Sequence, residues 1–224
     1  MRFQISASVA PGYYYLAAYI RNDGGTFQSS FPFSNNYSFS RTQVQVLPPP
    51  PLVLQKVAAR KVHGSAGTFD LTLSATAANP TTEPRWGGAG GSHLIVYTFD
   101  RPPVGGSAAV SSGVGAAGTP TFSGNEMRVP LSGVNDRQYV TVTASNVVAS
   151  DGGSGGGTIR IGFLVADVNQ SRVVSLADLG LVNALLSQPV TAANFLKDVN
   201  ASGTLTLADK GITSASLTRA LPPP

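Results

Sequence analysis

Two twelve-residue segments near the end of the sequence place oxygen-bearing side chains at matching positions. The first runs from Asp167 to Asp178, and the second, 31 residues further on, runs from Asp198 to Asp209. Counted from its first aspartate, each segment has Asn at position 3, Ser at position 5 and Asp at position 12. This spacing is typical of EF-hand-type loops, whose side chains converge on a calcium ion.

Calcium is a hard cation that takes roughly six to eight oxygen ligands. In such a loop, side chains at positions 1, 3, 5 and 12 and the backbone carbonyl of position 7 supply these oxygens. The predicted ligands of the first loop are therefore Asp167, Asn169, Ser171, Val173 and Asp178, and those of the second are Asp198, Asn200, Ser202, Thr204 and Asp209. The aliphatic residues at position 8, Val174 and Leu205, are expected to pair the two loops and face the core.

The distribution of acidic residues supports two calcium sites. From Gly152 to Pro224 the only acidic residues are the four aspartates at positions 1 and 12. An Asx turn that opens a helix is the structural alternative for one such segment. Two segments in register, each followed by helical spacing of apolar residues, favour calcium loops.

The two loops differ at position 6, where the first has Arg172 and the second has Gly203. The backbone turns sharply there, and a side chain resists that turn. Each loop offers two carboxylates, because position 5 is Ser in both. We therefore predict two Ca²⁺ sites, of which the second is the stronger.

The repeated pattern Asp-Val-Asn…Asp, followed each time by a helix, resembles the type I dockerin over residues 165–221. Dockerins are calcium-stabilised anchoring modules of cellulosomes and other bacterial extracellular assemblies. The resemblance implies calcium-dependent folding and an extracellular or cell-surface location. It also implies a cohesin-like or other extracellular protein as partner. Positions 10 and 11 are Leu176-Ala177 and Leu207-Ala208, where cellulosomal dockerins often present a small hydroxyl pair to cohesin.

Breaks rich in Pro or Gly divide the chain into segments. We expect a partial β-sandwich in residues 1–47, a polyproline linker in 48–51, an immunoglobulin-like β-sandwich in 52–165 and a small α-helical, paired EF-hand-like domain in 166–224. The fold class is thus mostly β. Seven strands are predicted in the sandwich, at Leu52–Ala58, Thr68–Leu73, His93–Phe99, Ala108–Ser111, Glu126–Leu131, Tyr139–Ala144 and Thr158–Leu164. Helical spacing is expected to continue to Leu186, and a second apolar set runs from Ile212 to Leu221.

Three strands are expected in the first segment, at Phe3–Ser8, Tyr13–Ile20 and Tyr37–Leu47, with a turn at Asn22-Asp23-Gly24-Gly25. The sequences Pro11-Gly12-Tyr13-Tyr14-Tyr15-Leu16 and Ser34-Asn35-Asn36-Tyr37 resemble a bacterial cell-adhesion-related (CARDB-like) repeat. In the second segment, Arg60-Lys61-Val62-His63-Gly64, Gly67-Thr68-Phe69-Asp70-Leu71 and Glu83-Pro84-Arg85 resemble a sandwich module that often precedes dockerin-like tails. Met1 is expected to open partway through a domain of a longer secreted protein, without a signal peptide.

Composition excludes several classes of partner. Fifteen Lys and Arg residues are scattered and do not interleave with aromatics, so nucleic acid is not expected. No apolar run reaches the roughly 18 residues of a membrane span. The chain has no cysteine, which fits either a reducing compartment or a bacterial secreted protein.

Motifs of catalysis fit their contexts poorly. Gly152 to Gly156 matches the nucleophile elbow, but both histidines, His63 and His93, precede it. The histidines are interpreted as strand-edge residues and not as metal ligands. The Gly113–Gly118 stretch matches a dinucleotide fingerprint that no helix follows, so it is interpreted as a loop. The dispersed acids Asp70, Glu83, Asp100 and Glu126 form no sequence pair suited to glycoside hydrolysis.

The sequence thus predicts a non-catalytic, calcium-binding extracellular module for attachment or assembly. One alternative is the accessory C-terminal region of a larger polysaccharide-degrading enzyme, whose catalytic domain lies elsewhere. A second is a carbohydrate-binding sandwich that uses the N-terminal tyrosines or Trp86, the only tryptophan. Because large aromatics are mostly interior, Trp86 is interpreted as a core residue, with sugar stacking as the alternative.

Overall fold

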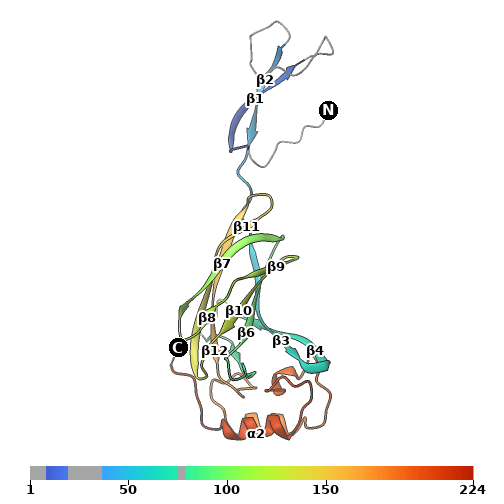
Figure 1. Cartoon of the computed structure of the whole chain (residues 1–224), viewed down its shortest axis with the longest axis vertical. Helices are drawn as coiled ribbons and strands as arrows, with labels where there is room; N and C mark the ends of the chain where they lie inside the picture. Colours follow the sequence, from blue (N-terminus) through green and yellow to red (C-terminus); the bar gives the residue numbers. More distant parts are fainter. Residues whose placement is uncertain (1–8, 20–36, 75–78, 224) are drawn as a thin grey trace. The chain divides into compact units, whose positions relative to one another are not determined.

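The computed structural model describes residues 9–19, 37–74 and 79–223, and the chain is mostly β. It divides into two compact units, Met1–Pro50 and Pro51–Pro224 (Figure 1). In the first unit, β1 (Gly12–Tyr19) pairs antiparallel with β2 (Tyr37–Val46). These are two of the three strands predicted for this segment. The third, Phe3–Ser8, and the Asn22–Gly25 turn lie outside the described residues.

The described strands of the second unit form two sheets. The first has the order β4-β3-β6-β10-β8, with β9 also paired to β10. Its strands are β3 (Leu54–His63), β4 (Gly67–Leu73), β6 (His93–Phe99), β8 (Ala116–Ala117), β9 (Thr121–Ser123) and β10 (Glu126–Ser132). A short 3-10 turn, η1 (Gly64–Ala66), joins β3 to β4.

The other sheet has the order β5-β12-β11-β7. Its strands are β5 (Thr82–Glu83), β7 (Pro103–Ser112), β11 (Gln138–Ala149) and β12 (Ser154–Phe163). Every pairing is antiparallel except that between β5 and β12. The seven strands predicted for this region are all present. The short strands β5, β8 and β9 were not predicted, because two or three residues are too few to show alternation.

Alternating side chains from both sheets close on a shared core. In β10, Met127, Val129 and Leu131 are buried, whereas Arg128 between them is only half-buried. The Tyr97 hydroxyl of β6 donates to the Val142 carbonyl of β11 at 2.9 Å, which satisfies a buried polar group across the two sheets.

Two short helices follow the strands, α1 (Leu176–Asn183) and α2 (Leu207–Ala215), with a 3-10 turn η2 (Phe195–Lys197) between them. Each helix begins with a capping box, Ser175 with Asp178 and Thr206 with Asp209. The prediction that the first helix continues to Leu186 is wrong, because the Leu185 and Leu186 amides each donate to the carbonyl three residues before them and the helix gives way to turns.

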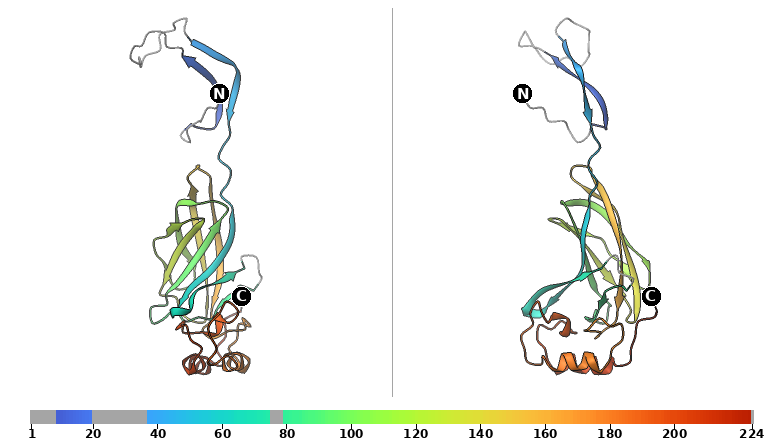
Figure 2. Two further views of the ribbon diagram at one scale, coloured as in Figure 1. Left: turned by 90° about the vertical axis from the view of Figure 1, so that its right-hand side faces the viewer. Right: turned by 180° about the vertical axis from the view of Figure 1, so that it is seen from behind.

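The segment from Leu164 onward, called the tail below, packs on the end of the sheets where β12 finishes and β3 turns into β4 (Figures 1 and 2). Tyr139 of β11 shares a buried cluster with Val168, Val182 and Leu221 of the tail. Sheets and tail therefore form one compact unit. None of the helices in the described ranges is long and apolar enough to cross a membrane.

Candidate metal-binding loops and their surroundings

The repeat seen in the sequence is also a repeat of backbone conformation. Position 4 is left-handed in both loops, with φ 60° at Gln170 and 56° at Ala201. Position 6 is left-handed as well, with φ 72° at Arg172 and 87° at Gly203. Two left-handed residues in one curl aim successive N–H groups inward, as a loop that holds a carboxylate requires.

The first aspartate of each loop accepts two of these N–H groups. Asp167 accepts from the Ser171 and Arg172 amides at 2.8 and 2.9 Å. Asp198 accepts from the Ser202 and Gly203 amides at 3.0 and 2.8 Å. The N–H groups fix the orientation of each carboxylate inside its own curl.

The aspartate at position 12 links the start of the helix back to the loop. Asp178 accepts from the Asn169 amide at 3.1 Å and from the Ser175 amide at 2.9 Å. Asp209 repeats both bonds, with Asn200 and with Thr206, at 3.3 and 2.9 Å. Helix capping and loop closure thus use the same carboxylate.

The neutral oxygens belong to the same network. In the first loop, Asn169 Oδ1 accepts from the Ser171 amide, and Ser171 Oγ donates to the Val173 carbonyl at 2.8 Å. In the second loop, Ser202 Oγ donates to the Thr204 carbonyl at 3.1 Å. The structure therefore links the predicted positions 1, 3, 5, 7 and 12 within each loop.

The residues at position 8 are buried as expected, but they do not pair the loops with each other. Val174 exchanges backbone hydrogen bonds with Thr218 and Arg219, beyond α2. Leu205 accepts from Ser187, beyond α1. Each loop thus forms backbone hydrogen bonds with the segment that follows the helix of the other repeat.

The electrostatics of the loops fit a bound cation. All four aspartates are fully buried. In the part of the chain that the structure describes, no Lys or Arg forms an ion pair with Asp167, Asp178 or Asp209. Burial raises the pKa of Asp167, and the nearby Asp178 charge raises it further. Buried carboxylates without a counter-charge are costly, and a divalent cation would remove that cost.

The donor set consists of oxygens alone. Among the described residues, no three His, Cys, Asp or Glu side chains gather as a candidate metal centre. Each loop instead combines two carboxylates with amide, hydroxyl and carbonyl oxygens, the set that a hard cation such as Ca²⁺ prefers. Beside the first loop, the buried Thr82 hydroxyl approaches Asp167 closely enough to lower its pKa slightly, yet it makes no hydrogen bond of ordinary geometry.

The second loop also contacts the sheets through His63. This residue ends β3, is fully buried, and places Nδ1 2.8 Å from Asp198 Oδ2. The interpretation of His63 as a strand-edge residue is therefore corrected. The sequence gives no local signal for this contact, because the two residues are 135 positions apart.

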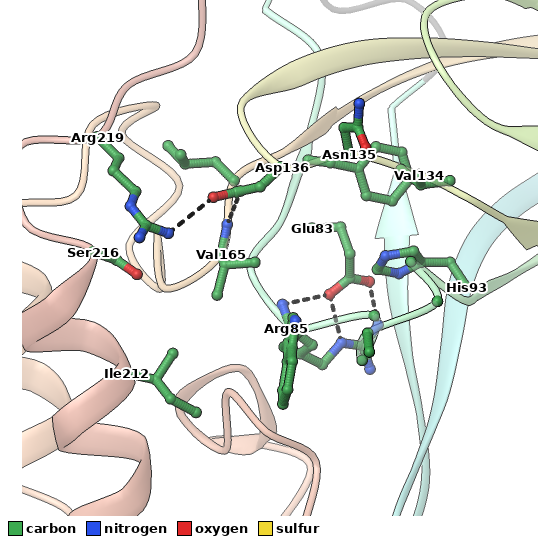
Figure 3. A pocket seen from close by; sticks show the side chains of 18 of the residues that line it. Glu83, Arg85, His93, Val134, Asn135, Asp136, Val165, Ile212, Ser216 and Arg219 are labelled. Carbon is green, nitrogen blue, oxygen red and sulfur yellow. Dashed lines mark hydrogen bonds and ion pairs between the residues drawn. The ribbon is translucent and has the colours of Figure 1, made fainter.

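Next to His63 lies a buried ion pair, shown in Figure 3. Arg85 donates to both carboxylate oxygens of Glu83, at 2.7 and 2.6 Å. The Arg85 charge lowers the pKa of Glu83 against the opposing effect of burial. Glu83 is thus not an isolated acid, and its proximity in sequence to Arg85 was the signal for this pairing.

The other dispersed acids are also held by bases. Arg60 pairs with both Asp70 and Glu126, at 2.7 and 2.8 Å, and so brings together two acids that the sequence left apart. Asp100 pairs with Arg101 at 2.9 Å. These ion pairs leave no free carboxylate pair among the four acids.

A crevice of about 530 Å³ lies between the sheets and α2 (Figure 3). It is lined by Trp86, the Gly87–Gly91 loop, Asn135, and the ion pair between Asp136 and Arg219. Trp86 is 46% exposed, so the interpretation of Trp86 as a core residue is wrong. His93 also lines the crevice, and burial lowers its pKa to about 4.

The two glycine-rich motifs noted in the sequence, Gly152–Gly156 and Gly113–Gly118, lie in turns and short strand segments. Asp151 accepts from the Gly153 amide in the turn that joins β11 to β12, and Ser154 begins β12 opposite Val148. Gly113 follows β7, and a short strand follows it in place of a helix.

No family model matches the chain, and comparisons with curated proteins and with solved structures found no match.

Proposed function

We propose that this chain is a non-catalytic, calcium-dependent attachment module of the bacterial cell exterior. In this proposal the tail is a dockerin-like domain and the two sheets are an immunoglobulin-like sandwich. The observation that carries the proposal is the pair of matching loops with fully buried aspartates, three of which form no ion pair with a base in the described part of the chain. Buried acids of this kind are stable when a cation holds them.

Ca²⁺ would be held in the first loop by Asp167, Asn169, Ser171, Val173 and Asp178, and in the second by Asp198, Asn200, Ser202, Thr204 and Asp209. The ion supplies positive charge between the carboxylates and ties position 1 to position 12. The chain itself supplies the orientation, through the N–H groups that each aspartate accepts.

The helices offer a surface for a partner. Leu176 and Leu207 begin α1 and α2 and are 74% and 73% exposed, and Leu181 on α1 is also exposed. Leucines exposed at the same position of two repeats, with small alanines beside them, suit the apolar centre of a protein interface. A cohesin-like or other extracellular protein is the partner that this surface favours.

Absence of catalysis is part of the proposal. Asp70, Glu83, Asp100 and Glu126 are each ion-paired with arginine. The Arg60 guanidinium lowers the pKa of Glu126 to about 2, far from the range of a general acid. As the accessory region of a larger polysaccharide-degrading enzyme, the chain would keep this same anchoring role.

Calorimetric titration of the chelator-treated chain with calcium tests the proposal. We expect two bound ions. The variant Asp178→Asn/Asp209→Asn should lose both, because position 12 in each loop then lacks its carboxylate. Asp151→Asn, outside the loops, is the matched control and should bind as the parent does. A parent chain that binds no calcium would refute the proposal.

A carbohydrate-binding sandwich is the second candidate, and the exposure of Trp86 favours it. An indole face beside a crevice with amide, carboxylate and guanidinium groups suits stacking on a sugar ring. A glycan array decides between the two functions. Binding that persists in chelator and disappears in Trp86→Ala supports this candidate, whereas no binding leaves attachment through the tail.

A further inference from the structure

A buried chain of polar side chains runs from the sheets into the second loop. It begins with the bidentate pair of Glu83 and Arg85, at 2.6 and 2.7 Å. Arg85 Nη1 lies 3.4 Å from His63 Nε2, and His63 Nδ1 lies 2.8 Å from Asp198 Oδ2. All four side chains are buried. These contacts are therefore shielded from bulk solvent.

The neighbours of His63 determine which of its ring nitrogens carries the hydrogen. Arginine has only donors, so the contact with Arg85 makes Nε2 of His63 an acceptor. We therefore assign the hydrogen to Nδ1, which donates to Asp198. Asp198 then accepts three N–H groups, two from its own loop and one from β3. The direction of this carboxylate is fixed by both parts of the unit.

The backbone of the second loop packs closely against the turn between β3 and β4, at His63 and Gly64. A Cβ atom on Gly203 would lie 2.5 Å from the His63 carbonyl oxygen. A Cβ atom on Gly64 would lie 2.1 Å from the Ser202 carbonyl oxygen. Both glycines are therefore required by close approach of the two backbones. The Trp86 amide adds a hydrogen bond of 2.7 Å to the Val199 carbonyl.

Aromatic contacts position the η2 segment, which directly precedes the second loop. Phe195, in η2, stacks on Phe69 of β4 with ring centroids 5.3 Å apart and planes at 12°. The Arg85 guanidinium lies 5.2 Å from the Phe195 ring centre. Phe195 precedes Asp198 by three residues, so this contact and the His63 bond position the start of the loop together.

Among the described residues, the first loop has no equivalent buried side-chain contact, although the Ala166 amide before it donates to the Pro84 carbonyl at 2.9 Å. Its aspartate at position 1, Asp167, faces the Thr82 hydroxyl without a hydrogen bond of ordinary geometry. At position 6, Arg172 reaches an exposed contact with Asn79 at 2.7 Å. Of the two loops, only the second receives from the described strands a buried side-chain donor at ordinary hydrogen-bond geometry.

We propose that the second calcium site is a composite site, completed by His63 from the sheets, and that an ion bound there fastens the tail to them. His63 is a positioning residue, because it acts on the ion through Asp198. This inference rests on the proposed calcium binding. Hydrogen-bond partners of metal ligands typically contribute about 10–100-fold to metal affinity.

The test compares two substitutions of His63 in the full chain by calcium calorimetry. His63→Phe keeps a ring but removes the donor, and should weaken one site by about tenfold or more while the other keeps its affinity. His63→Asn retains an N–H donor at the δ position and should recover most of that loss. His93→Phe replaces the other histidine and should leave both affinities unchanged.

Two kinds of failure are distinguishable. If the parent binds two ions and His63→Phe binds both with parental affinity, the composite site is refuted while calcium binding stands. If His63→Asn loses as much affinity as His63→Phe, the hydrogen bond is not the cause and the inference also fails. A parent that binds no ion refutes the proposed function itself. Circular dichroism and thermal unfolding of each variant at saturating calcium establish that the fold persists.

Discussion

Arg172 and Gly203 occupy the same position of the two loops and adopt the same left-handed backbone, with φ 72° and 87°. Glycine takes this conformation freely, whereas a residue with a Cβ atom is strained in it by about 1–2 kcal/mol. The first loop therefore carries a strain that the second does not.

Replacing Arg172 by glycine should relieve this strain. We expect Arg172→Gly to raise the free energy of unfolding by up to about 1 kcal/mol, since the exposed bond to Asn79 that it loses contributes little. Chemical denaturation at saturating calcium measures the change. Arg172→Lys keeps the Cβ atom and should bring no gain. A less stable Arg172→Gly chain would contradict the prediction.

The opposite substitution in the second loop should be harmful. Gly203→Ala adds a Cβ atom 2.5 Å from the His63 carbonyl oxygen, in addition to the left-handed strain. We expect a loss of more than about 2 kcal/mol of unfolding free energy. Gly124→Ala is the matched control, because Gly124 also has a positive φ but open space around its Cβ position. Equal losses in the two variants would show that close approach contributes nothing.

The two sites should also differ in how they respond to loss of the first aspartate. Asp198→Ala should reduce total calcium affinity more than Asp167→Ala, because the second loop has the unstrained glycine at position 6 and the donor from His63. Calorimetric titration of both variants measures this difference. Equal or reversed losses would refute the ranking of the sites.

The ion pairs of Arg60 predict acid sensitivity in the sheets. The Arg60 guanidinium lowers the pKa of Glu126 to about 2, against roughly 4.3 in an unfolded chain. Ionised Glu126 thus stabilises the fold above the unfolded value, and this contribution disappears as the pH falls towards 2. Glu126→Gln should melt below the parent at pH 7, and the difference should narrow between pH 5 and pH 2. A constant difference would contradict the prediction.

Short sequence patterns predicted the local structure of strands and loops correctly. The stretch Glu126–Leu131 was predicted as a strand, and the structure confirms it as β10, in which Met127 and Val129 are buried. The spacing of the loop aspartates predicted two matching curls, and Asp167 and Asp198 do accept the same pair of loop amides. Both patterns depend on neighbours within a few residues, which the sequence displays directly.

Contacts between distant segments were not predictable in the same way. The bond from His63 to Asp198 depends on how the tail docks against β3, and no local pattern encodes that docking. Trp86 was expected in the core from its size alone. The glycines that follow it have no side chains to cover the indole, and a crevice remains beside it. Residue type thus predicted the chemistry of single groups but not their surroundings.

Removal of calcium should destabilise the tail far more than the sheets. Each bound ion contributes about 2.7 kcal/mol when its concentration is a hundred times its dissociation constant. Without the ions, the buried Asp167 and Asp178 of the first loop repel each other. The capping boxes of α1 and α2 depend on the position-12 carboxylates, which a bound ion would help to hold. Circular dichroism of the full chain should therefore show loss of helical signal and a lower melting temperature in chelator, with the strand signal retained.

Returning calcium should restore the helical signal and the melting temperature. Magnesium, which requires a tighter octahedral site, should restore them less. An unchanged helical signal and melting temperature in chelator would contradict this prediction.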